Sequence, residues 1–99
     1  MTFRFEKPII YLITKGEATE SNFVHARREI LDIVRVAVDE GVSLVQLREK
    51  RLSARSLIEL TTAVAAVTRG APTRLLVNDR ADIAVAAGAD GVHLAANSL

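Results

Sequence analysis

The residues best suited to chemistry form the polar run Gln46–Lys50, at the carboxyl end of an apolar segment that we predict to be a buried strand. Alternate residues of a strand share a face, so Gln46, Arg48 and Lys50 would point the same way. Such a polar row is costly to bury unless it meets a ligand or a counter-charge. A phosphate or pyrophosphate would suit it, because arginine binds these groups bidentately and lysine binds them as a point charge. The spacing leaves a second reading open, a solvated strand end whose cations pair with Glu49 and with surface carboxylates.

A second polar group, Asn78-Asp79-Arg80, follows the next predicted strand. Asp79 could hold Mg²⁺, a hard cation that takes one or two carboxylates together with substrate phosphates. Asn78 could donate a hydrogen bond to a substrate. The alternative is structural, because Asn or Asp before Ala81 would be a suitable N-cap for a following helix. The nearness of the first polar run favours the binding role.

The histidines are less informative. His93 lies in a predicted strand between two apolar residues, where a histidine is more often a satisfied core group than a catalyst. We expect a structural role for it. His25 lies near a predicted helix start among charged residues, which indicates a solvated surface position. Tyr11, in the first predicted strand, could line the interior or be an ordinary core residue.

The elements that position these residues alternate regularly along the chain. Short apolar runs predict strands, and apolar residues at helical spacing predict helices. Ser53 suits a helix start, and Gly41 suits a helix end. The predicted strands are 9–14, 42–47, 75–77 and 91–94, and the predicted helices are 23–40, 53–69 and 81–87.

The order β-α-β-α-β-α-β implies parallel strands joined by helical crossovers. A doubly wound nucleotide-binding sheet is disfavoured, because no strand is followed by the G-x-G-x-x-G fingerprint or by a P-loop. We therefore predict an α/β fold that is the N-terminal half of a (β/α)8 TIM barrel. Residues 1–99 would form a single partial domain, since a whole barrel needs about 250 residues.

Composition excludes several classes of protein. The 99 residues carry 13 Lys and Arg against 12 Asp and Glu, so no strong field would attract nucleic acid or an anionic membrane. No apolar run approaches the ~18 residues of a membrane span, and no signal peptide is evident. Cysteine is absent, which rules out disulfides and thiolate metal sites and fits a reducing cytoplasm, where we expect the protein.

Taken together and in this order, four segments resemble the thiamine phosphate synthase family, including its thiazole tautomerase relatives. The similarity spans nearly the whole chain, and the second and third segments together are quite specific. The matching segments are Tyr11-Leu12-Ile13-Thr14, Gly41-Val42-Ser43-Leu44-Val45-Gln46-Leu47-Arg48-Glu49-Lys50, Leu75-Leu76-Val77-Asn78-Asp79-Arg80 with Asp82-Ile83-Ala84, and Gly88-Ala89-Asp90-Gly91-Val92-His93-Leu94.

The resemblance implies thiamine biosynthesis on a (β/α)8 barrel. The synthase joins a hydroxymethylpyrimidine pyrophosphate to a thiazole phosphate, and pyrophosphate leaves before the thiazole nitrogen attacks. It also implies that Gln46, Arg48, Lys50 and Asn78 contact the pyrimidine pyrophosphate and that Asp79 is a Mg²⁺ ligand. Clustered cations and Mg²⁺ would stabilise the departing charge, which is electrostatic catalysis by a transferase. No residue of this chain is assigned to covalent or acid–base catalysis.

One position departs from the synthase pattern. Ser98 stands where the family has a second metal-binding aspartate, and a neutral hydroxyl cannot replace the charge of a carboxylate at a Mg²⁺ site. The ending Asn97-Ser98-Leu99 is closer to the tautomerase branch, whereas Asp79 favours the synthase. A thiazole tautomerase-like enzyme and a non-catalytic binder of a phosphate ligand therefore stay open as alternatives.

Four strands of a barrel leave two sheet edges and an inner face uncovered. Exposed edges pair readily with another chain, so we expect self-association, or association with a missing C-terminal half. We also expect that this chain is a piece of a longer protein. The 99-residue chain alone is then expected to be inactive.

Overall fold

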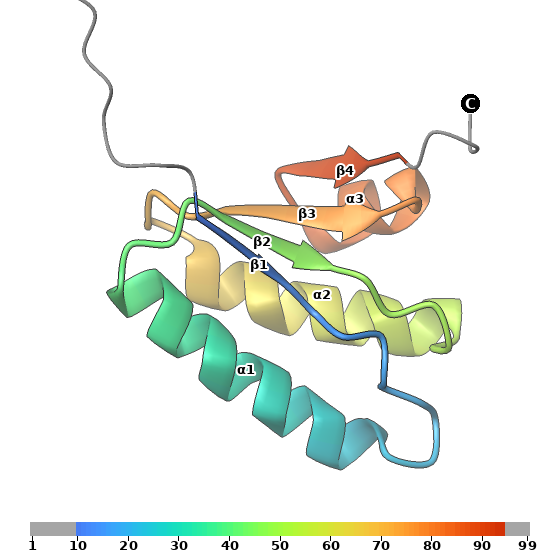
Figure 1. The fold of residues 1–99 in the computed structure, drawn as a ribbon. Helices are drawn as coiled ribbons and strands as arrows, with labels where there is room; N and C mark the ends of the chain where they lie inside the picture. The colour runs from blue at the N-terminus through green and yellow to red at the C-terminus, as the bar shows by residue number, and fades with distance from the viewer. Residues whose placement is uncertain (1–9, 95–99) are drawn as a thin grey trace, which may run out of the picture.

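The computed structural model describes residues 10–94, which form one parallel sheet and three helices in strict alternation (Figure 1). This is the predicted element order. The elements are β1 (Tyr11–Ile13), α1 (Phe23–Asp39), β2 (Leu44–Leu47), α2 (Ala54–Thr68), β3 (Arg74–Asn78), α3 (Ala81–Ala87) and β4 (Gly91–His93).

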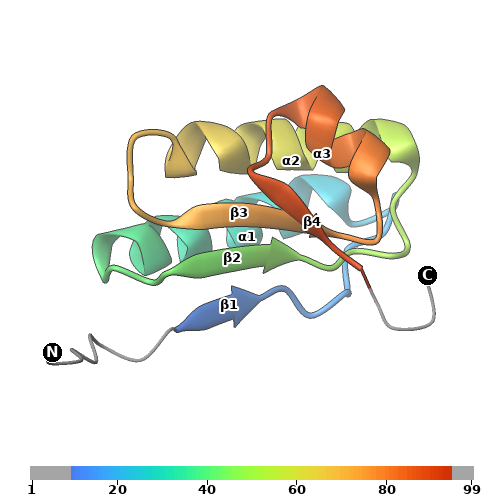
Figure 2. The same cartoon turned by 90° about the horizontal axis from the view of Figure 1, so that it is seen from above.

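The strand order is β1-β2-β3-β4, and every neighbouring pair is parallel. In the register of the sheet, Ile13 faces Gln46, Leu47 faces Val77, and Asn78 faces His93. All four strands point the same way, as Figure 2 shows from above. Their carboxyl ends therefore meet at one edge of the sheet, where the polar residues that follow the strands are gathered.

The core lies between the sheet and the helices, which all cover the same face (Figures 1 and 2). Alternate residues of the two central strands point into it, because successive strand side chains lie on opposite faces. Val45 and Leu47 of β2 are fully buried, as are Leu75 and Val77 of β3. Helix α2 contacts both α1 and α3, and completes the layer. This rigid base fixes the strand ends.

Two helix ends follow their sequence signals. Ser53 caps α2, and its Oγ accepts the backbone N–H of Ser56 at 3.1 Å. Gly41 ends α1 with φ of +77°, a left-handed conformation that costs glycine little. Asn22 occupies the N-cap position of α1, but its side chain makes no capping hydrogen bond to the helix.

The second face of the sheet is covered by no helix among residues 10–94. Tyr11 is 56% exposed and Ile13 is 48% exposed, and both lie on the edge strand β1. Of the two positions that the sequence left open for Tyr11, that of an ordinary core residue was therefore wrong for the described part of the chain. The side chains of β1 on the uncovered face are apolar, and only further structure packed on that face would bury them. Residue Ile9, the predicted start of this strand, lies outside the described residues.

Helices of residues 10–94 include none that is both long enough and apolar enough to cross a membrane.

Candidate functional site

The carboxyl ends of β2, β3 and β4 are joined by a side-chain cluster on the uncovered face of the sheet. Gln46 is 7% exposed, and its Nε2 donates to Asn78 Oδ1 at 3.1 Å. The same nitrogen lies 3.4 Å from His93 Nδ1. An amide nitrogen can only donate, so a neutral His93 ring accepts at Nδ1 and keeps its proton on Nε2. Two residues of the sequence-predicted site, Gln46 and Asn78, are thus in direct contact.

His93 is exposed at the end of β4, so the expectation of a core position was wrong. The reason is its face: it shares the uncovered side of the sheet with its register partner Asn78 and with Gln46. The structure adds His93 to the site, since its ring touches the same amide.

Arg48 and Lys50 flank this cluster from a loop instead of a strand. Strand β2 ends at Leu47, so the alternation that placed both cations on the face of Gln46 does not extend to them. Both are exposed, and within residues 10–94 neither side chain makes a hydrogen bond or an ion pair. The backbone of Arg48 is held, because its N–H donates to Thr14 Oγ1 at 2.8 Å. The two cations are free to meet an anion.

Glu49, between these two exposed cations, is buried, with 5% of its surface exposed. Its Oε2 accepts the backbone N–H of Gly16 and its Oε1 accepts that of Ala18, both at 2.9 Å. The sequence alternative in which Glu49 neutralises its neighbours was therefore wrong. Sequence analysis missed this role, since the only signal was one acidic residue between two cations.

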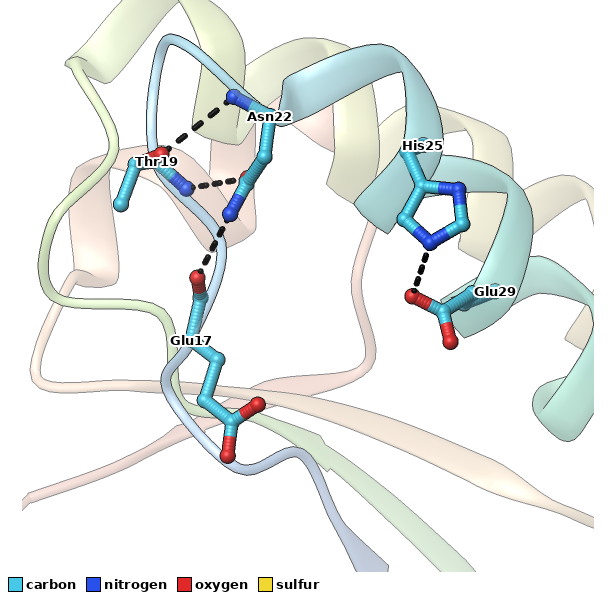
Figure 3. A network of polar contacts seen from close by, with 5 residues as sticks. All are labelled: Glu17, Thr19, Asn22, His25 and Glu29. Carbon is cyan, nitrogen blue, oxygen red and sulfur yellow. Dashed lines mark hydrogen bonds and ion pairs between the residues drawn. The ribbon is translucent and has the colours of Figure 1, made fainter.

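The loop between β1 and α1, which Glu49 binds, is shaped by its own hydrogen bonds (Figure 3). Asn22 Oδ1 accepts the N–H of Thr19 at 2.7 Å, and its Nδ2 donates to the Glu17 carbonyl at 3.0 Å. One turn into α1, His25 Nε2 lies 2.9 Å from Glu29 Oε1. Both of these side chains are exposed, which confirms His25 as a surface residue.

Asp79 follows β3 in an unusual backbone conformation. Its φ is +60°, which aspartate tolerates better than most residues, and its N–H donates to the His93 carbonyl at 2.7 Å. Its Oδ2 accepts Asn78 Nδ2 at 3.4 Å. The alternative of a helix cap was wrong, because α3 has Arg80 as its N-cap residue and no side-chain cap bond. Asp79 therefore lies beside the amide cluster and outside the helix.

Arg80 and Asp82 form a bidentate pair next to this turn, with Nε–Oδ1 at 3.1 Å and Nη2–Oδ2 at 2.9 Å. The hydrogen bonds from Arg80 lower the pKa of Asp82, and the same pair raises the pKa of Arg80. Arg80 is thus engaged with the first turn of α3. This leaves Arg48 and Lys50 as the cations of the site without a counter-charge in the described part of the chain.

The donor set for a metal is small. Across residues 10–94, no three His, Cys, Asp or Glu side chains gather into a metal site built from protein ligands alone. Asp79 offers one carboxylate, and Asn78 Oδ1 already accepts from Gln46. This set fits a Mg²⁺ ion that takes its remaining ligands from phosphate oxygens and water. Ser98, the predicted replacement for a second carboxylate, lies outside the described residues.

Comparison with known proteins gives consistent matches. The family model described as Thiamine monophosphate synthase matches residues 10–99. The thiamine-phosphate synthase of Methanoculleus marisnigri is 48% identical over 68 residues, which is 69% of this chain and 32% of that protein. The one from Solidesulfovibrio magneticus is 42% identical over 87 residues, which is 88% of this chain and 38% of that protein.

A solved structure agrees with these matches. Thiamine phosphate pyrophosphorylase from Pyrococcus furiosus superposes with a TM-score of 0.67 at 29% identity, over 84% of this chain and 37% of that one. The chain thus spans about a third of the length of the relatives that it matches. Its four parallel strands and three helices are a segment of a TIM-barrel-like fold, as predicted. The chain belongs to the thiamine monophosphate synthase family.

Proposed function

We propose that this chain serves thiamine biosynthesis as the part of a thiamine phosphate synthase that binds the pyrimidine pyrophosphate. The observation that carries the proposal is the Gln46–Asn78 hydrogen bond at the joined strand ends, with two unpaired cations in the adjoining loop. Family membership supports the same reaction, the joining of a hydroxymethylpyrimidine pyrophosphate to a thiazole phosphate with release of pyrophosphate.

In this proposal the residues have separate roles. Arg48 grips the pyrophosphate bidentately and Lys50 binds it as a point charge, so that negative charge gathering on the leaving group is stabilised. Gln46 holds Asn78 in place, and because Asn78 Nδ2 gives one hydrogen to Asp79 Oδ2, its second amide hydrogen remains for the substrate. The site is open to solvent in the described residues, so further structure would have to exclude water during the reaction.

Asp79 is the residue that would hold Mg²⁺ when pyrophosphate is bound. The ion would supply further neutralisation of the phosphate charge. The turn suits this role, because the left-handed φ of Asp79 places its carboxylate beside the Asn78 amide instead of at the start of α3.

The uncovered sheet face and the two free edges are the proposed contacts with the rest of the protein. Tyr11 and Ile13 expose about half of their surface there, and such apolar area is normally buried in a finished barrel. The remaining part of a longer chain, or a second copy, would cover it. No nucleic acid or membrane partner is proposed. Because the chain has no cysteine, a reducing cytoplasm is the proposed location.

The test combines binding with turnover. Isothermal titration of the chain with inorganic pyrophosphate in Mg²⁺ should give saturable binding that is lost in Arg48→Ala. The chain alone should release no pyrophosphate from the pyrimidine pyrophosphate and thiazole phosphate, because about two thirds of its relatives' length is not in it. Absence of pyrophosphate binding would refute the proposed role. Binding without turnover, even in a chain completed to the length of the relatives, would favour the non-catalytic binder instead of the synthase.

A further inference from the structure

Glu49 is an acidic residue in the middle of a site that we propose binds an anion, and this needs a physical explanation. By charge alone a carboxylate between Arg48 and Lys50 opposes pyrophosphate binding. The residue is nevertheless buried, with 5% of its surface exposed. Burial of a charged group is tolerated where hydrogen bonds satisfy it, and each carboxylate oxygen here accepts one backbone N–H at 2.9 Å.

The two N–H groups come from Gly16 and Ala18, in the loop that leaves β1, more than thirty positions away in the sequence. Glu49 therefore ties two loops together at the carboxyl edge of the sheet. The tie is tight at Gly16, whose φ is +80° and whose Cα lies so close that a Cβ there would come within 3.2 Å of the Arg48 carbonyl oxygen. A side chain at that position would push the loops apart.

Two further bonds join Thr14, just after β1, to Gln46 and to Arg48 at the end of β2. The N–H of Thr14 donates to the Gln46 carbonyl at 3.1 Å, and the N–H of Arg48 donates to Thr14 Oγ1 at 2.8 Å. Thr14 is 8% exposed, so this bond is shielded from water. The backbone from Gln46 to Glu49 is thus fixed at three points, while the side chain of Arg48 makes no hydrogen bond in the described part of the chain.

We propose that Glu49 is a positioning residue of the phosphate site: its buried carboxylate clamps the β1–α1 loop to the end of β2 and so holds Arg48 and Lys50 ready for an anion. This inference rests on the proposed function. Pre-organised donors bind an anion without the cost of ordering a loop at the moment of binding. In this proposal, the affinity gained by holding the loop in place is larger than the affinity lost to repulsion between the Glu49 carboxylate and the bound anion.

The competing explanations predict opposite signs for Glu49→Gln. Glutamine keeps the shape and one acceptor oxygen, but its amide nitrogen faces a backbone N–H, so one clamp bond is lost. If Glu49 acts through its charge alone, neutralising it tightens pyrophosphate binding. If it only stabilises the fold, the melting temperature falls and the folded protein binds as before. If it positions the loop, the folded protein binds pyrophosphate more weakly.

The experiment measures pyrophosphate binding by titration calorimetry, and the rise in melting temperature that saturating pyrophosphate causes. We expect Glu49→Gln to weaken binding about tenfold and to reduce that rise, at a protein concentration and temperature where circular dichroism shows it folded. Glu59→Gln, an exposed change of the same type on α2, is the matched control and should bind as the unaltered chain does. Thr14→Val leaves Glu49 intact but removes the bond from the Arg48 N–H to Thr14 Oγ1, which holds the same backbone, and should weaken binding in the same direction without any change of charge.

The outcomes separate this inference from the proposed function. If the unaltered chain binds no pyrophosphate, the phosphate site itself is refuted, and the role of Glu49 in it falls with it. If the unaltered chain binds and Glu49→Gln binds equally well or more tightly, the site stands and the positioning role is overturned. Should Glu49→Gln fail to fold, Thr14→Val decides whether attachment of this loop backbone positions Arg48: weaker binding supports the positioning, and unchanged binding overturns it.

Discussion

Replacing Gln46 with leucine would remove the amide that joins the strand ends while keeping a side chain of similar size. The change removes the 3.1 Å bond to Asn78 Oδ1 and the longer 3.4 Å contact with His93 Nδ1. Asn78 is half-buried and His93 is exposed, so water can reach both groups after the change. The penalty for unsatisfied groups is therefore small, and the loss is close to that of a single neutral hydrogen bond.

A neutral hydrogen bond contributes about 0.5–1.5 kcal/mol, so we expect Gln46→Leu to lower the free energy of unfolding by about 1 kcal/mol. For a chain of this size that is a fall in melting temperature of roughly 4–8 °C. Pyrophosphate binding should weaken as well, because Asn78 loses the partner that orients it. A loss of about 1 kcal/mol of binding free energy corresponds to a roughly fivefold larger dissociation constant.

A double-mutant cycle isolates this bond. Denaturation of Gln46→Leu, Asn78→Ala and the double variant should give a coupling energy of about 1 kcal/mol. Asn22 is the control, because its amide bonds only within its own loop. Gln46→Leu and Asn22→Ala should add within about 0.5 kcal/mol, as independent sites do. A coupling between Gln46 and Asn78 no larger than that of the control would refute the link between β2 and β3.

Three further variants test other parts of the site and its support. Arg48→Ala should weaken pyrophosphate binding about tenfold or more, since charge-assisted hydrogen bonds are worth about 1.5–3 kcal/mol. It should change stability little, because the side chain is exposed. Calorimetry checks this against Arg55→Ala, an exposed change on α2, and equal affinities of the two variants would contradict it. Asp79→Asn should keep the backbone, because asparagine also tolerates positive φ, and should abolish the enhancement of pyrophosphate binding by Mg²⁺; an enhancement that survives in the variant would remove Asp79 as the ligand. Hydrogen bonds from the Ser53 N–H and, to a smaller extent, from the Ser56 hydroxyl lower the pKa of Glu20. The stability that these bonds contribute is therefore present above the ordinary pKa of glutamate and is lost as pH falls through the lower pKa of the folded state. Glu20→Gln should therefore flatten the acid side of a stability-against-pH curve, and parallel curves for the two proteins would show that this bond is not linked to folding.

The sequence predicted the fold well because the strongest signals are periodic. Val45 and Leu47 alternate with polar or half-buried neighbours, and most of the apolar residues at helical spacing in α1 and α2 face the core, although Ile33 of α1 is 48% exposed. Strand order and the position of the polar strand ends follow from β/α alternation. The matched relatives confirm the fold class and the family.

The site was predictable only in part, because contacts between strand ends depend on geometry that a sequence does not carry. Gln46 and Asn78 were predicted as site residues and are in contact, but the bond that joins them could not be foreseen. The sequence left open that Glu49 pairs with its neighbours, yet each of its carboxylate oxygens accepts a backbone N–H from another loop. The end of β2 at Leu47 also broke the alternation that had aligned Arg48 with Gln46.

The central claim is that pyrophosphate binds where β2 and β3 end. Amide resonances of the isotope-labelled chain, followed by NMR during titration with inorganic pyrophosphate and Mg²⁺, test it residue by residue. We expect the largest shift changes at Gln46–Lys50 and at Asn78–Asp79, saturating together with one dissociation constant. Changes centred instead on the start of α1 around Asn22, or no saturable change at either strand end, would contradict it.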